Sequence, residues 1–174
     1  MAELVARLAR FRVPLGFVAG ALVLVLARPS WPSLGGGTIV ALVGEAIRIW
    51  AAGHLEKSRE VTRSGPYRWS RHPLYVGSVL MGAGVAVAAS SLIAAGLISV
   101  YLGATLYSAI RTEEAFLRGR FGPEYDDYCQ GRAVAVDRPF CWSRAWRNRE
   151  YRAVVGMGAV FVVLALKALL STGP

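Results

Sequence analysis

Charged and apolar residues fall into separate blocks along this chain, and that pattern restricts its possible folds. Charges are nearly absent from several stretches of about 15–20 residues and are concentrated between them. A soluble protein mixes the two, because each surface helix presents a polar face to water. About 20 apolar residues span the roughly 30 Å hydrocarbon layer of a bilayer. The pattern therefore predicts helices that cross a membrane.

The apolar stretches predict an all-α integral membrane bundle of about five transmembrane helices. The expected spans are residues 13–27, 34–55, 74–90, 91–110 and 153–170. No repeat or linker divides residues 1–174, so one domain is expected. The first stretch lacks a good small-residue cleavage site and is interpreted as a helix rather than a signal peptide. The fourth helix is expected to continue beyond the bilayer through residues 112–120.

Basic residues predict the orientation of the bundle. Of the 20 Lys and Arg residues, only Arg28 and Lys167 fall on the side opposite the predicted N-terminus. Cytoplasmic loops carry the excess of positive charge, so the N-terminus and the long polar loops are expected in the cytoplasm. The net charge of +9 then suits anionic membrane lipid rather than nucleic acid.

A motif at the start of the predicted third helix carries polar and aromatic side chains. It runs Gly65-Pro66-Tyr67-Arg68-Trp69-Ser70-Arg71-His72-Pro73-Leu74-Tyr75-Val76-Gly77. Pro73 suits the first position of a helix, where unpaired N–H groups attract anions. His72 and Tyr75, three residues apart, would project side by side. They could bind a heterocyclic ligand, or they could belong to an aromatic belt at the membrane interface.

Two further motifs follow the predicted fourth helix. Arg111-Thr112-Glu113-Glu114 places two carboxylates just beyond a membrane span, where they would face water, a partner or a ligand. A water-exposed helix face paired with Arg118 is the alternative. In residues 121–128, Tyr125 and Tyr128 share one side of a short amphipathic helix, which could be a lid or could lie on the membrane interface.

In order and spacing, these motifs resemble the isoprenylcysteine carboxyl methyltransferase family, and the chain is also similar to phospholipid N-methyltransferases. The resemblance covers roughly residues 48–142. It implies a cytoplasmic segment that binds S-adenosylmethionine as the methyl donor, and a lipophilic acceptor. Leu74 stands where the related sterol reductases usually carry Asn, which favours a methyltransferase.

The resemblance also implies site residues. The cofactor contacts would be Tyr67, the run His72, Pro73, Leu74 and Tyr75, and Glu113, with the strand-like run Glu60, Val61 and Thr62 contributing backbone. Arg111 would lie near the acceptor carboxylate, with Glu114 as a second catalytic candidate. Neither the resemblance nor the spacing of Cys129 and Cys141 indicates a metal site, and free thiols are expected.

The chemistry of the acceptor leaves two hypotheses open. A carboxylate is already ionised at neutral pH and needs positioning beside a cation, as in an isoprenylcysteine-like group. A phospholipid or other amine needs a proton acceptor, such as Glu114 or Glu45. The acceptor is expected to enter from the bilayer and the cofactor from the cytoplasm. The Ala-, Gly-, Val- and Arg-rich composition suggests a bacterial inner membrane.

Two hypotheses from other classes remain. The first is a haem-binding membrane protein with His54 and His72 as axial ligands. The second is a non-catalytic scaffold or small transporter, in which Glu45 and Arg48 form an intramembrane pair.

Overall fold

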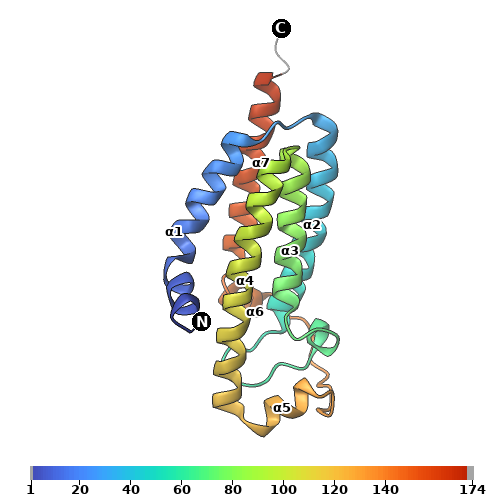
Figure 1. Ribbon diagram of the computed structural model, residues 1–174. Helices are drawn as coiled ribbons and strands as arrows, with labels where there is room; N and C mark the ends of the chain where they lie inside the picture. Colours follow the sequence, from blue (N-terminus) through green and yellow to red (C-terminus); the bar gives the residue numbers. More distant parts are fainter. Residues whose placement is uncertain (1, 172–174) are drawn as a thin grey trace.

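A computed structural model describes residues 2–171 of the chain, with side chains from residue 14 onward. The described part is a bundle of long helices with a smaller region at one end (Figure 1). In chain order the elements are α1 (Ala2–Leu26), α2 (Trp31–His54), the 3₁₀ turn η1 (Gly65–Arg68), α3 (Pro73–Ala89), α4 (Leu92–Phe121), α5 (Pro123–Cys129), α6 (Trp142–Arg147) and α7 (Tyr151–Ser171). The end that carries η1 and α5 is called the site end below.

Three of these helices, α2, α4 and α7, are long and apolar enough to cross a membrane. The apolar part of α1, Pro14–Leu26, and α3 are shorter apolar helices. All five expected helices are therefore present, and each begins or ends within a few residues of its prediction, apart from two extensions. The first helix starts at Ala2 rather than near residue 13, and the fourth ends at Phe121.

The extension of α4 was expected from residues 112–120. Its 30 residues would be about 45 Å long, longer than the roughly 30 Å hydrocarbon layer. The last turns of α4 therefore project past the ends of its neighbours at the site end (Figure 1). Gly122 has φ +49°, and Pro123 then starts α5, so the chain turns sharply beneath the cavity described below.

Helices α2 and α3 pack closely because glycines face each other. A Cβ on Gly44 would lie 2.6 Å from the carbonyl oxygen of Gly77, and a Cβ on Gly84 would lie 2.6 Å from that of Gly37. Small residues allow such close approach between membrane helices. This contact fixes α3, and with it the His72–Tyr75 motif, against α2.

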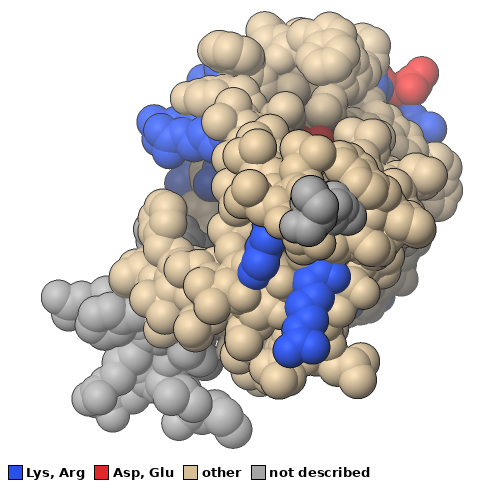
Figure 2. Space-filling view, turned by 90° about the horizontal axis from the view of Figure 1, so that it is seen from above, with Lys and Arg blue, Asp and Glu red and all other residues tan. Residues whose placement is uncertain are grey.

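The end opposite the site is held by apolar packing and by helix caps. Ser30 and Ser33 form a capping box at the start of α2. Lys167 Nζ donates to the carbonyl oxygens of Leu24 and Val25, at 2.8 and 2.6 Å, at the end of α1. Seen from this end, most of the visible surface is uncharged (Figure 2). The buried core here consists of Val23, Ala27, Leu34, Ala88, Ala89, Ala94, Leu164 and Ala168.

Candidate active site

A cavity of about 550 Å³ lies at the site end, between the loop after α2, the start of α3, α4 and α5. Nine residues in its lining are those that the sequence predicts to contact the cofactor: Glu60, Val61, Thr62, Tyr67, His72, Pro73, Leu74, Tyr75 and Glu113. The fold thus brings two distant segments to one cavity. Their role in binding stays a prediction.

A polar cluster joins the start of α3 to α4 beside this cavity. The Tyr75 O–H donates to Glu113 Oε2 over 2.8 Å. His72 Nε2 lies 3.2 Å from Glu114 Oε1, and the His72 ring stacks on Tyr75 with centroids 5.6 Å apart. The rings meet because residues three apart share one side of a helix. Glu113 keeps 40% of its side chain exposed, so it can also accept hydrogen bonds from a ligand.

The two predicted catalytic residues are not brought to the cavity wall. Arg111 is exposed and absent from the lining of the cavity. Glu114 also lies outside the lining, where it is engaged by His72 and by Arg71, whose Nη1 is 3.6 Å away. The suggested pairing of this face with Arg118 is wrong, because Arg118 binds Asp126. Catalytic roles for Arg111 and Glu114 remain predictions.

Tyrosines of α5 complete the cavity wall. The Tyr128 O–H donates to the backbone carbonyl of Tyr67 over 2.7 Å, and Tyr125 is buried. Burial raises the pKa of Tyr128 to about 12. Burial, followed by the nearby charge of Glu113, also raises the pKa of Tyr67. Both phenols therefore keep their protons at neutral pH. The sequence analysis left open whether this helix is a lid or lies on the membrane interface, and the structure places Tyr125 and Tyr128 in the lining of the cavity.

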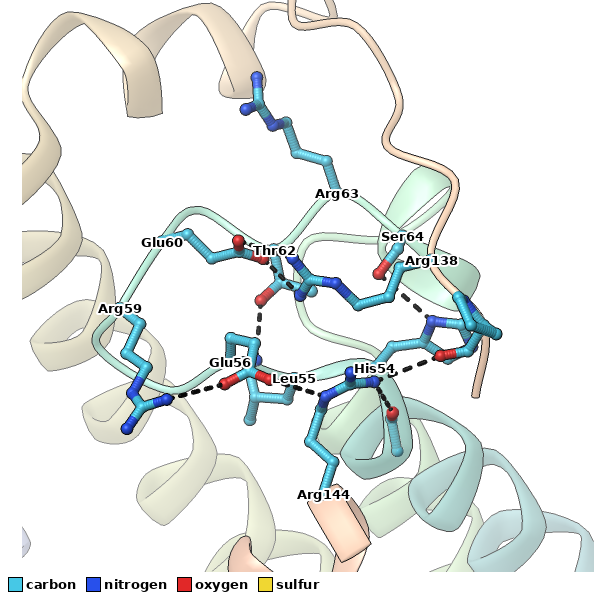
Figure 3. A network of polar contacts seen from close by, with 12 residues as sticks. His54, Leu55, Glu56, Arg59, Glu60, Thr62, Arg63, Ser64, Arg138 and Arg144 are labelled. Carbon is cyan, nitrogen blue, oxygen red and sulfur yellow. Dashed lines mark hydrogen bonds and ion pairs between the residues drawn. The ribbon is translucent and has the colours of Figure 1, made fainter. Parts of the chain in front are cut away.

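Ion pairs hold the loop that lines the cavity (Figure 3). Arg138 donates to both carboxylate oxygens of Glu60, at 2.6 and 2.7 Å. Arg144 Nε donates to Glu56 Oε1 over 2.8 Å, and the Glu56 N–H donates to Thr62 Oγ1. The run expected to be strand-like is an irregular loop. Its Glu60 side chain is bound by Arg138, and the Thr62 hydroxyl accepts from the Glu56 N–H.

These arginines come from the segment after α5, which the sequence analysis did not assign to the site. Residues 131–141, called the strap here, cross the loop after α2. Arg68 Nη2 is 3.0 Å from Asp137 Oδ1, and the Val136 N–H donates to the carbonyl of Arg63. The strap therefore braces Glu60, Val61 and Thr62 from outside the cavity.

Arg48 on α2 has a different partner from the one expected. The predicted Glu45–Arg48 pair is wrong: Arg48 Nε donates to Glu150 Oε1 over 2.6 Å, and its Nη1 donates to Ser78 Oγ. The carboxylate oxygens of Glu45 have no hydrogen-bond partner among the described residues. Glu150 lies in the turn before α7, so this contact ties α7 to α2 and α3.

A second cavity of about 360 Å³, called the deeper cavity because it lies farther from the site end, opens among α1, α2, α3, α4 and α7. Its lining is mostly apolar, including Val23, Val85 and Ile98, and small residues such as Gly20 leave it open. Arg48 lines both this cavity and the larger one. The larger cavity, which carries the charged motif residues, and the mostly apolar second cavity thus share Arg48 in their linings.

The two histidines have separate partners. His54 Nδ1 lies 3.2 Å from Ser64 Oγ, whereas His72 is engaged by Glu114. Among the described residues, no group of three His, Cys, Asp or Glu side chains is placed to hold a metal ion. Nothing in this arrangement favours the haem hypothesis.

The chain resembles known proteins over about half of its length. A family model described as phospholipid methyltransferase matches residues 34–124. The chain is 33% identical over 96 residues to a nickel-cobalt-cadmium resistance protein of Alcaligenes xylosoxydans xylosoxydans, covering 54% of this chain and 43% of that protein. It is 30% identical over 106 residues to a probable protein-S-isoprenylcysteine O-methyltransferase of Oryza sativa subsp. indica, covering 54% of this chain and 56% of that protein.

The chain thus spans about half the length of these curated relatives. No solved structure matches it at a significant level. The matched region contains the predicted cofactor residues and Arg48, but it ends before the strap, α6 and α7.

Proposed function

Since the chain belongs to the phospholipid methyltransferase family, we propose that it transfers a methyl group from S-adenosylmethionine to a lipophilic acceptor. The cofactor would occupy the larger cavity, and the apolar part of the acceptor the deeper one. One observation carries the proposal: the cavity lined by the motif residues and the mostly apolar cavity among the helices share Arg48 in their walls. A methyl donor and a lipid-like acceptor could meet there.

The residues of the larger cavity fit the cofactor. About 550 Å³ falls within the roughly 300–1,000 Å³ of small-molecule and cofactor sites. The Glu113 carboxylate, fixed by Tyr75, can accept hydrogen bonds from ribose hydroxyls or an ammonium group. Val61 and Leu74 supply apolar wall beside these groups. When bound, the cofactor supplies an electrophilic methyl group on a sulfonium.

A carboxylate acceptor, such as an isoprenylcysteine-like group, suits the junction. It is ionised at neutral pH and needs no base. What the protein can add is alignment and exclusion of water. Arg48 is the cation proposed for alignment, because it lines both cavities and its guanidinium is held by Glu150 and Ser78. It replaces Arg111 in this role, since Arg111 does not reach the cavity.

A phospholipid or other amine is the second candidate acceptor, and the name of the family favours it. An amine must lose a proton to become a nucleophile. Glu113 is a partly exposed carboxylate of the cavity and can accept that proton, whereas Glu60 is bound by Arg138 and Glu114 by His72 and Arg71. The deeper cavity would take the apolar part of either acceptor.

The proposed location is a bacterial plasma membrane, with the site end in the cytoplasm, where the soluble methyl donor is made. The exposed apolar side chains along α4 and α7, such as Val100, Val155 and Leu170, suit contact with lipid.

Calorimetric titration of the detergent-purified chain with S-adenosylhomocysteine tests the proposal. We expect saturable binding near one molecule per chain and at least about tenfold weaker binding in Glu113→Gln, since a hydrogen bond to a charged group contributes about 1.5–3 kcal/mol. Glu124→Gln is the matched control, because Glu124 pairs with Arg63 outside the cavity. No binding by folded protein would instead favour a scaffold or transporter. Normal binding by Glu113→Gln would remove Glu113 from the site.

A further inference from the structure

Tryptophans gather at the site end, around α6. The chain has five tryptophans, and four of them, Trp50, Trp69, Trp142 and Trp146, lie on α2, just after η1, or on α6. They form a series of ring contacts: Trp50 with Trp69, Phe140 with Trp142, and Trp146 with Tyr151. Three of these indoles are largely exposed, by 77% for Trp69, 71% for Trp142 and 68% for Trp146. Rings with an apolar body and an N–H donor concentrate at membrane interfaces.

The chain around α6 exposes positive charge and almost no negative charge. Arg147 is 60% exposed at its side chain, and Arg149 and Arg152 are also exposed. Arg149 and Arg152 form no ion pair with any described residue. Glu150 is the only carboxylate in this stretch, and it is buried against Arg48. The exposed charge of residues 142–152 is therefore positive.

The fold places these side chains at one level. α6 ends at Arg147, and Arg149 adopts φ +60° in the turn that starts α7 at Tyr151. α7 is long and apolar enough to cross a membrane, and its first exposed apolar residues are Val154 and Val155. Arg149 and Arg152 thus lie within about two helical turns of the point where an exposed apolar surface begins, and Trp146 stacks on Tyr151 at the start of α7.

We propose that this α6 surface, made of Trp142, Trp146, Arg147, Arg149, Tyr151 and Arg152, binds the headgroup of an anionic phospholipid. The planar guanidinium group matches phosphate oxygens in a bidentate manner. The indoles seat at the headgroup level, and the acyl chains lie along the exposed apolar start of α7. This continuity from cationic to apolar surface selects a lipid over an acidic protein segment, which would leave the apolar part uncovered.

Native mass spectrometry of the full chain, released from detergent micelles, tests the proposal by titration with phosphatidylglycerol and with phosphatidylcholine of the same acyl chains. We expect a saturable adduct with phosphatidylglycerol at concentrations where phosphatidylcholine gives little. Arg147→Gln/Arg149→Gln/Arg152→Gln should weaken it by roughly 100-fold, since each basic residue near an anionic surface contributes on the order of fivefold.

The matched control is Arg118→Gln/Arg120→Gln/Arg132→Gln, which removes the same charge from exposed positions on α4 and next to α5, where Arg118 and Arg132 pair with carboxylates of α5 rather than with α6. It should bind phosphatidylglycerol like the parent chain. Unchanged binding of S-adenosylhomocysteine and a retained cooperative melting transition would show that both triple variants are folded. Equal adducts with both lipids, or equal loss in the control, would overturn the proposal. So would a dimer that dissociates in the α6 variant, since a second copy would then be the occupant.

Discussion

Arg48 and Glu45 lie one turn apart on α2, yet they do not pair. Arg48 reaches Glu150, 102 residues away in the chain, and Ser78 on α3. Side chains three residues apart can meet on a free helix, but here the turn before α7 brings a carboxylate within 2.6 Å of the guanidinium. Tertiary contacts, rather than spacing along the helix, therefore decided the partner of Arg48.

Glu56 offers a residue-scale test of how the loop is held. Burial alone would raise its pKa, but the hydrogen bond and charge of Arg144, with further help from Arg147, bring the pKa below its ordinary value of 4.5. A depressed pKa in the folded state adds stability above 4.5, and this stability is lost as the pH falls through the folded value. We expect Glu56→Gln to melt at a lower temperature than the parent at pH 6 and to differ less from it as the pH falls below 4.5. Equal curves throughout would exclude this contribution.

Among the elements, α2 and α3 form the contact that positions the motif. Gly44→Ala would set a Cβ 2.6 Å from the Gly77 carbonyl oxygen and 2.7 Å from the Met81 nitrogen. Both are backbone atoms of α3 and cannot move independently of the helix, so we expect the free energy of unfolding to fall by about 1–3 kcal/mol. Gly103→Ala on α4 is the control, because nothing lies within 4 Å of its Cβ position. It should be neutral or slightly stabilising. Thermal unfolding in detergent measures both, and equal effects would refute the close contact.

The predicted arrangement of five membrane spans can be tested on the whole molecule by labelling cysteines from each side of the membrane. Cys141 lies at the site end, whereas Leu92 begins α4 at the other end and is 93% exposed. In a Cys129→Ser background, an impermeant maleimide should reach Cys141 only from the cytoplasmic face. With Cys141 also replaced by Ser, Leu92→Cys should react only from the opposite face. Labelling of both positions from one face would contradict the five-span arrangement.

The sequence by itself determined the helices and nine of the residues that line the larger cavity. Block segregation of charge is a local property, so it placed five apolar helices, and only the start of the first was misplaced appreciably. Eight of the nine predicted cofactor residues fall between residues 60 and 75 and the ninth is Glu113, and the resemblance to a methyltransferase family identified them without coordinates.

Only the tertiary structure decided which other residues complete the cavities and which segments support them. Arg48 in the walls of both cavities, Glu150 as its partner, and the strap over Glu60 all depend on segments distant in the chain. The strap, α6 and α7 also lie outside the region matched by the family model. An apolar pattern predicts that a helix is buried or faces lipid, but it does not specify which neighbour it contacts. That choice follows from close packing of small residues and from pairing of buried charges across the folded bundle.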